Sequence, residues 1–330
     1  MKPDIHGTYE KNRVARLLGR PYPLVQGGMA WVANAALAAA VSNGGGLGLI
    51  AASNMPPDLL EKELLSIRTL TDKPYGLNIM LMSPTVDDAI ALAEKYRVPI
   101  VTTGAGSPGK VIDRLKPMGT VVIPVIASVA HARRVEKQGA DAVVAEGMEA
   151  GGHIGELTTM ALVPQVVDSV NIPVIAAGGI ADGRGIVAAF ALGAEGVQVG
   201  TRFICCTECT VHPDYKRAVL DARDRSNTVT GRVTGHPVRC LKNKLTAQFD
   251  ELDKTHAPLD AYERLGAGRL RAAVVDGDVE NGSVMAGQIA GLVNDIRDAA
   301  DIIREMFSQA ERIAAAMAER SFPRPSAAVK

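Results

Sequence analysis

The sequence predicts an α/β fold, a (β/α)8 TIM barrel with a small inserted subdomain and C-terminal helices. Eight short apolar runs recur through the first two-thirds of the chain, and amphipathic segments fill the intervals. The first and last runs start at residues 24 and 196, 172 residues apart, so seven repeats average about 25 residues. Eight strand–helix units in alternation favour a closed barrel. The alternative is an open doubly wound sheet, although no Gly-x-Gly-x-x-Gly motif follows the first run.

The apolar runs are the predicted strands. Most are short, rich in β-branched residues or ended by glycine, and Gly or Pro bounds them. Because their apolar residues follow one another without alternation, we expect both faces of each strand to be buried, as in a parallel sheet. In chain order they cover residues 23–28, 47–52, 75–81, 99–104, 121–128, 142–147, 173–179 and 196–203.

Helices are predicted between these strands, and several end in glycine or a polar turn before the next strand. They cover residues 58–70, 85–96, 109–118, 130–139, 158–170 and 183–192. After residue 203 the repeat stops, and residues 204–268 are polar, charged and irregular. We expect this stretch to be a small inserted substrate or lid subdomain. The barrel would then comprise residues 1–203 and 269–330, with helices at 284–298 and 301–319 closing over it.

Composition and charge exclude several functional classes. Among 330 residues, Lys plus Arg and Asp plus Glu each number 36, so no basic field attracts nucleic acid. Aromatic residues make up only 4%, which argues against base-stacking surfaces. The longest apolar run, 29–41, is interrupted by Asn34 and is too short to span a bilayer. With no apolar signal segment near the start, we expect a cytoplasmic protein without nucleic-acid or membrane partners.

The four cysteines are predicted to be reduced, structural thiols. Cys205, Cys206 and Cys209 form a cluster to which Cys240 or His212 could add a fourth ligand. Adjacent cysteines rarely face one tetrahedral zinc without strain, and paired Cys-x-x-Cys motifs are missing. A metal site therefore remains the less favoured alternative, and none is predicted.

Polar side chains occur inside three of the predicted strands, near the ends where a barrel builds its active site. They are Asn78, Glu146 and Gln198. A buried polar group costs free energy unless it is paired. These residues either bind nearby backbone groups or bind the edge of a planar heterocycle, and three of them together favour the heterocycle.

Two glycine segments follow the seventh and eighth predicted strands. One contains Gly178 and Gly179, and the other contains Gly200 and Thr201. Glycine lets backbone N–H groups approach an anion closely, and the loops after strands 7 and 8 form the usual phosphate site of this architecture. The sequence therefore predicts one phosphate cradle. No adenine-binding unit accompanies it.

One histidine lies on the loop after the sixth predicted strand. His153 follows Gly151 and Gly152 in a glycine-rich turn. Its ordinary pKa near neutrality suits proton donation or abstraction, so it is the candidate catalytic residue. The alternative is a structural histidine in a tight turn.

Several ordered segments resemble the FMN-dependent enoyl-[acyl-carrier-protein] reductase II (FabK type), within the wider nitronate monooxygenase family. The resemblance covers residues from about 15 to 295 of the 330 in this chain. It is carried by residues 26–31, 76–81, 101–106, 145–159, 176–182, 197–203 and 282–291.

The resemblance implies a barrel that holds FMN non-covalently, takes electrons from NADH or NADPH and reduces trans-2-enoyl-acyl carrier protein. This is the final step of the bacterial type II fatty-acid elongation cycle. It also implies a homodimer and a monovalent cation, whose site no residue identifies. His153 matches the family's active-site histidine. The positions matching flavin or phosphate contacts are Gly28, Met29, Ala30, Asn78, Glu146, Gly151, Gly178, Gly179, Gln198, Gly200 and Thr201.

Three other functions stay open. A nitronate monooxygenase uses the same FMN barrel, with a histidine that abstracts a proton from a nitroalkane. The long match at 146–155 and the polar insertion favour the reductase. A metal-free isomerase or lyase acting on a sugar phosphate, and a non-catalytic flavin carrier, are the further alternatives.

A cationic segment is the predicted docking surface for acyl carrier protein, which is acidic. Within residues 211–245, eight basic and three acidic side chains give a formal charge of 8 − 3 = +5. The alternative is an ordinary solvated face. The basic residues are Lys216, Arg217, Arg223, Arg225, Arg232, Arg239, Lys242 and Lys244.

Overall fold

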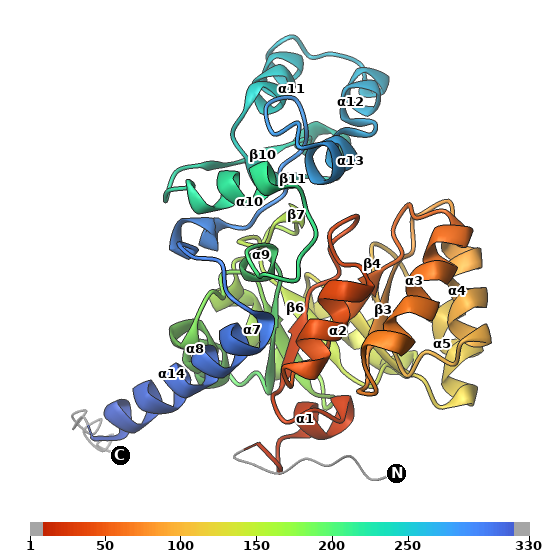
Figure 1. The fold of residues 1–330 in the computed structure, drawn as a ribbon, viewed down its shortest axis with the longest axis vertical. Helices are drawn as coiled ribbons and strands as arrows, with labels where there is room; N and C mark the ends of the chain where they lie inside the picture. Colours follow the sequence, from red (N-terminus) through yellow and green to blue (C-terminus); the bar gives the residue numbers. More distant parts are fainter. Residues whose placement is uncertain (1–8, 320–330) are drawn as a thin grey trace, which may run out of the picture.

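Eight parallel strands form the predicted barrel in the computed structural model, which describes residues 9–319. Their order around the sheet is β1-β9-β8-β6-β5-β4-β3-β2, and helices surround them (Figure 1). The strands are β1 (Leu24–Gln26), β2 (Leu49–Ala51), β3 (Gly76–Met80), β4 (Ile100–Gly104), β5 (Val121–Ile126), β6 (Val143–Glu146), β8 (Val174–Ala177) and β9 (Gly196–Val199). The (β/α)8 prediction is confirmed, and each strand lies within its predicted run.

The ring of strands closes between β1 and β2. Val25 and Leu47 form an isolated parallel bridge there, and the amide oxygen of Gln26 accepts a hydrogen bond from the N–H of Leu49 at 3.0 Å. Gln26 is fully buried, so this side chain replaces ladder bonds that the short β2 lacks.

The six predicted barrel helices form, and one helix that was not predicted precedes them, α2 (Ala35–Asn43). Its N-cap is Asn34, whose side chain accepts a hydrogen bond from the N–H of Leu37 at 3.2 Å. The polar residue that interrupts the apolar run 29–41 is thus a helix N-cap. The barrel helices are α2 (Ala35–Asn43), α3 (Pro57–Leu70), α4 (Val86–Lys95), α5 (Gly109–Leu115) with a 3-10 turn at Lys116–Met118, α6 (Val129–Lys137), α7 (Thr159–Val167) and α8 (Gly183–Ala191).

The inside of the barrel is a packed apolar core. Val25, Leu49 and Ile175 from the strands meet Val14 and Leu18 of α1 (Arg13–Leu18), all at most 1% exposed. Burying an aliphatic side chain of this size stabilises the fold by about 1.5–3 kcal/mol. Because α1 fills one end of the barrel, below the strands in Figure 1, only the carboxyl ends of the strands remain for a site.

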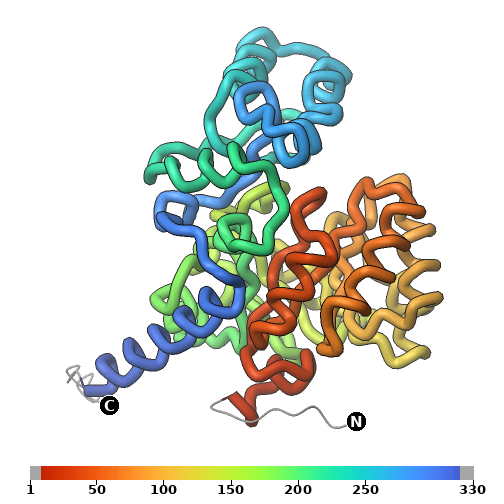
Figure 2. Tube along the Cα trace, viewed as in Figure 1, coloured from red at the N-terminus to blue at the C-terminus, as the bar shows by residue number. Residues whose placement is uncertain are grey.

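Residues 205–287, which we name the upper segment, stand above the barrel. Figure 2 traces the chain leaving the barrel, folding into this segment and returning before the last helix. The segment contains α10 (Pro213–Leu220), β10 (Asn227–Thr230), β11 (Val238–Leu241), α11 (Lys244–Lys254), α12 (Leu259–Gly266), α13 (Arg269–Arg271) and a π-helical turn at Ala272–Asp276. The expectation of an irregular 204–268 is therefore wrong, because short regular elements underlie its polar composition.

The helix expected at 284–298 is also wrong. Only a 3-10 turn forms, at Gln288–Leu292. The reason is close packing of backbone on backbone: a Cβ on Gly287 would come within 2.8 Å of the carbonyl oxygen of Glu149, and one on Gly291 within 3.0 Å of the carbonyl carbon of Arg223. The segment therefore follows the surface of the barrel loops instead of coiling.

The last helix, α14 (Ala299–Glu319), confirms the prediction at 301–319 and packs against α8 and α2. A Cβ on Gly183 would approach the backbone nitrogen of Ala310 to 2.5 Å, so glycine allows α8 to touch α14. Within residues 9–319, no helix combines the length and the apolar character needed to cross a bilayer.

Candidate active site

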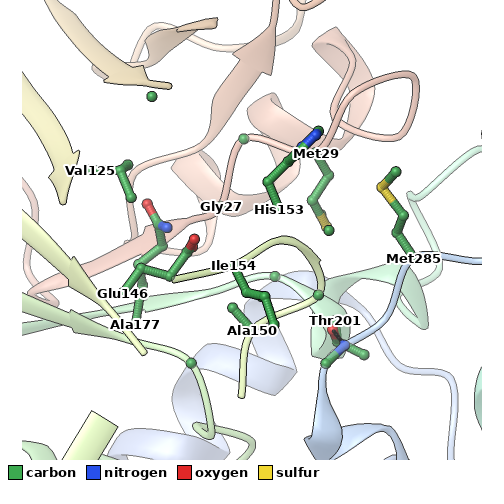
Figure 3. A pocket seen from close by; sticks show the side chains of 18 of the residues that line it. Gly27, Met29, Val125, Glu146, Ala150, His153, Ile154, Ala177, Thr201 and Met285 are labelled. Atoms are coloured by element: carbon green, nitrogen blue, oxygen red, sulfur yellow. Dashed lines mark hydrogen bonds between the residues drawn. The ribbon is translucent and has the colours of Figure 1, made fainter. Parts of the chain in front are cut away.

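A cavity of about 440 Å³ opens at the carboxyl ends of the barrel strands, within the usual size range of ligand sites. Barrel strands and loops form most of its wall, and the upper segment contributes Tyr215, Leu270, Met285 and Gly287. Figure 3 shows Glu146 and Met285 on opposite sides of it. All the predicted site residues line this one cavity: Gly28, Met29, Ala30, Asn78, Glu146, Gly151, His153, Gly178, Gly179, Gln198, Gly200 and Thr201.

Asn78 is held in one orientation at the end of β3. Its side-chain nitrogen donates to the hydroxyl of Thr102 at 2.9 Å, and Thr102 is fully buried. On the other side, a Cβ on Gly28 would come within 2.2 Å of the Asn78 side chain. Gly28 therefore makes room for Asn78, and the amide can present a fixed edge to a planar ligand.

Glu146 ends β6 with its carboxyl group buried in the cavity wall. Burial raises the pKa of Glu146 to about 7. Among the described residues no side chain donates a hydrogen bond to it, so nothing offsets the loss of solvent. Near neutral pH the carboxyl therefore populates both protonation states, and it can donate to or accept from a heterocycle.

The glycines after β8 form a cradle of backbone donors. Gly178 and Gly179 have φ of 89° and 74°, the left-handed region that favours glycine. Within residues 9–319 neither of their N–H groups is hydrogen-bonded to the chain. A Cβ on Gly200 would lie 3.5 Å from the sulfur of Met29, so a side chain there would enter the same space. Two free donors and an open glycine surface fit a phosphate group.

The eighth predicted strand ends earlier than expected. β9 stops at Val199, and Thr201–Ile204 form the short helix α9 instead of continuing the run 196–203. The hydroxyl of Thr201 accepts a hydrogen bond from the N–H of Gly287 at 2.9 Å. Thr201 thus holds the returning chain against the cavity, a contact between residues 86 positions apart that sequence periodicity does not reveal.

His153 lies on a strand that the sequence did not predict. β7 (Gly152–His153) pairs antiparallel with β11, and His153 lies opposite Val238. The imidazole is open to the cavity, while the surrounding walls and His236 lower the pKa of His153. It is therefore mainly neutral at pH 7 and can accept a proton.

Several cavity residues were not singled out from the sequence, and those with polar or sulfur-bearing side chains include Glu149, His131, Tyr215 and Met285. His131 follows β5 in the first turn of α6, so the strand-end rule could have found it. Burial, and then Arg134, lower the pKa of His131. Tyr215 and Met285 come from the upper segment, whose placement over the barrel no local pattern indicates.

The cysteine cluster lies in the core, and its thiols are unreactive near neutral pH. Cys205, Cys206, Cys209 and Cys240 are all buried free thiols. Burial raises the pKa of Cys205 to about 11 and that of Cys206 to about 12, so both remain protonated near neutrality. In the described part of the chain, no three His, Cys, Asp or Glu side chains are grouped as metal ligands.

The fold and site together show a barrel with glycine loops after its last two strands and titratable groups over a central cavity, an arrangement typical of barrel enzymes. The chain belongs to the nitronate monooxygenase family, whose model matches residues 11–97 and 86–309. It is therefore an oxidoreductase of that family, and the resemblance found in the sequence is confirmed.

Three relatives illustrate the range of this family. The structure of FabK from Thermotoga maritima is 51% identical, with a TM-score of 0.90 over 93% of this chain and 98% of that one. A probable nitronate monooxygenase of Staphylococcus saprophyticus is 35% identical over 91% of this chain and 98% of its own. A 5-hydroxy-7a-methyl-1-oxo-octahydro-1H-indene-4-carboxyl-CoA dehydrogenase of Mycobacterium tuberculosis is 34% identical over 89% of this chain and 94% of its own.

Proposed function

We propose that the cavity holds FMN and that the chain reduces trans-2-enoyl-acyl carrier protein with NADH or NADPH. FMN, when bound, supplies hydride transfer from the nicotinamide to the β-carbon of the enoyl thioester. The residues present fit this cofactor. Gly178, Gly179 and Gly200 would hold its phosphate, while Asn78, Glu146 and Gln198 would bind the edge of its ring system.

His153 is proposed to supply the proton that the α-carbon gains. Its imidazole is open to the cavity. His153 is also the histidine that matches the family's active-site residue. Because the pKa of His153 is lowered from the usual 6.5, its imidazolium is a stronger acid than that of free histidine. The imidazolium is the main form only when the pH is below this lowered pKa. The reaction would therefore favour the acidic side of neutrality.

The observation that carries the proposal is the single phosphate cradle beside polar strand ends, in a chain 51% identical to FabK. The 34% identity to a carboxyl-CoA dehydrogenase supports a thioester substrate in addition. The test is anaerobic stopped-flow spectroscopy. The bound flavin is reduced with NADH, and its reoxidation is followed after addition of crotonyl thioester. A protein without flavin absorbance, or without thioester-dependent reoxidation, contradicts the proposal.

Acyl carrier protein is the proposed partner, and the upper segment offers a smaller docking surface than the sequence suggested. Arg239 is only 5% exposed, the amino group of Lys216 donates to the carbonyl of Cys206 at 2.7 Å, and Lys244 pairs with Glu280. The amino group of Lys242 likewise donates to the carbonyl of Arg225 at 2.7 Å. The exposed cations that remain, which we call the docking cations, are Arg217, Arg223, Arg225 and Arg232.

Several further features of the proposal come from the sequence pattern or from the family resemblance. We propose a cytoplasmic homodimer that binds a monovalent cation. We also propose that residues 204–268 act as a substrate or lid subdomain on the barrel formed by 1–203 and 269–330. One residue of this stretch supports the lid role, because Tyr215 forms part of the cavity wall.

Nitronate oxidation with O2 is the second candidate, and one observation favours it. The lowered pKa of His153 leaves a neutral imidazole at pH 7, which is the form that abstracts a proton from a nitroalkane. The 35% identity to a probable nitronate monooxygenase agrees with this reading. Parallel assays with nitroethane under O2 and with crotonyl thioester without O2 separate the two reactions.

A further inference from the structure

One buried cation has no role in the functions considered so far. Arg239 is 5% exposed, and within residues 9–319 its guanidinium forms no ion pair with a carboxylate. Burial lowers the pKa of Arg239, and Arg232 adds to the effect, while the carboxylate of Glu149 opposes it without forming an ion pair within residues 9–319. A buried charge without a partner is costly, so a residue of this kind needs a compensating contact.

The compensating contact reaches the loop that carries the catalytic candidate. The Nε of Arg239 donates to the carbonyl oxygen of Met148 at 3.0 Å. Met148 lies between Glu146, at the end of β6, and His153 on β7. A charged donor forms a stronger hydrogen bond than a neutral one, so this contact fixes the middle of the loop.

The backbone around Arg239 fixes the far end of the same loop. Arg239 lies opposite Gly152, and Val238 lies opposite His153, in the pairing of β11 with β7. The N–H of Ile154 donates to the carbonyl of Pro237 at 3.1 Å. Directly opposed residues of an antiparallel pair share one face of the sheet, so Arg239 and His153 project from opposite faces.

We propose that Arg239 is a positioning residue, which holds the loop 147–152 through Met148 and thereby sets the place of His153 over the cavity. It does not touch the reacting atoms, because it acts from the other face of the small sheet. The inference rests on the proposed function only through His153, since either candidate reaction moves a proton at that imidazole.

The test compares the two half-reactions of the flavin in three variants. Arg239→Met retains bulk and removes the cation, Arg239→Lys retains the charge with poorer geometry, and Arg239→Ala leaves space for a small ion. Arg264→Met is the matched control, because Arg264 is an exposed arginine of α12 that pairs with Asp260. Each protein is measured for FMN content, reduction by NADH, and reoxidation by crotonyl thioester.

We expect Arg239→Met to bind FMN and to react with NADH like the parent, while reoxidation slows about 10²-fold, the cost of misplacing a reacting group by about 1 Å. Arg239→Lys should recover part of the rate, and millimolar guanidinium ion should accelerate Arg239→Ala but not Arg264→Met. Equal slowing of both half-reactions, unchanged reoxidation, or no rescue by guanidinium or by Lys overturns the inference. If the parent itself fails to react with thioester, the proposed function is wrong. The rates of the same variants are then measured with nitroethane and O2, and the inference about Arg239 is judged on that reaction.

Discussion

The carboxylate of Glu149 accepts a hydrogen bond from the backbone N–H of Thr159 at 2.9 Å, and the Thr159 hydroxyl also lies 2.9 Å from it. The same hydroxyl lies 3.0 Å from the carbonyl of Gly178. The start of α7, the loop after β6 and the glycine cradle after β8 thus meet at one carboxylate. This arrangement links the stability of a helix to the shape of the proposed phosphate site.

Glu149→Ala should therefore weaken both the start of α7 and the glycine cradle after β8. Loss of a capping carboxylate typically costs about 0.5–2 kcal/mol, so we expect a lower melting temperature in the variant. We also expect faster FMN release. Without the Glu149 carboxylate, Thr159 is no longer fixed in its place beside the carbonyl of Gly178. Glu156→Ala, in the same loop but exposed, is the control. Equal flavin affinity in Glu149→Ala and the parent would show that the cradle does not depend on this carboxylate.

Gly200→Val tests the cradle directly. The new Cβ meets only the side chain of Met29, whose sulfur lies at an ordinary contact distance of 3.5 Å, so the chain should fold. The side chain would occupy the space proposed for the phosphate, and the purified protein should be largely colourless. The flavin released from the denatured parent should be FMN. Chromatographic recovery of stoichiometric FAD, or a fully yellow Gly200→Val protein, would contradict this placement.

His153→Ala should retain flavin and its reduction by NADH, but lose about 10²–10⁴-fold in the step that moves a proton. The pH dependence of the parent identifies the direction of transfer. Because the pKa of His153 is lowered from 6.5, a proton donor would be active below that pKa and would lose activity as the pH rises through it. A proton acceptor would show the reverse. A pH profile shared by the parent and His153→Ala would assign the titration to another group.

Salt should weaken the reaction with acyl carrier protein if the docking cations recruit it. Opposite charges mainly raise the association rate and are screened by ions. We expect kcat/KM for enoyl-acyl carrier protein to fall more steeply with ionic strength than for the same acyl group on pantetheine. Charge reversal at Arg223 and Arg225 should reduce the first and spare the second. Reversal at Lys62 and Lys73, exposed on the barrel side, changes the net charge equally and serves as the control.

The barrel and the cavity lining were predictable because their signals are local. Strands buried on both faces appear as continuous apolar runs, and a parallel barrel brings all their carboxyl ends to one rim. Residues as distant as Gly28 and Thr201 could therefore be assigned to one site. β7 could not be predicted, since it is two residues long and exists only through pairing with β11. Likewise, the apolar spacing of 284–298 suggested a helix, but the glycines there serve close backbone contacts.

The closure of the barrel through Gln26 also bears on how the cavity wall can move. Between β3 and β4 a ladder of five residue pairs joins the strands, whereas β1 and β2 share one bridge and one side-chain bond. The ring is therefore least stiff at this seam. Gly27 and Gly28 extend from one side of it and Ser53 follows the other, all on the cavity wall. The most weakly paired neighbours of the barrel thus lie beside the proposed ligand site, where small movements of the strands would change the shape of the cavity.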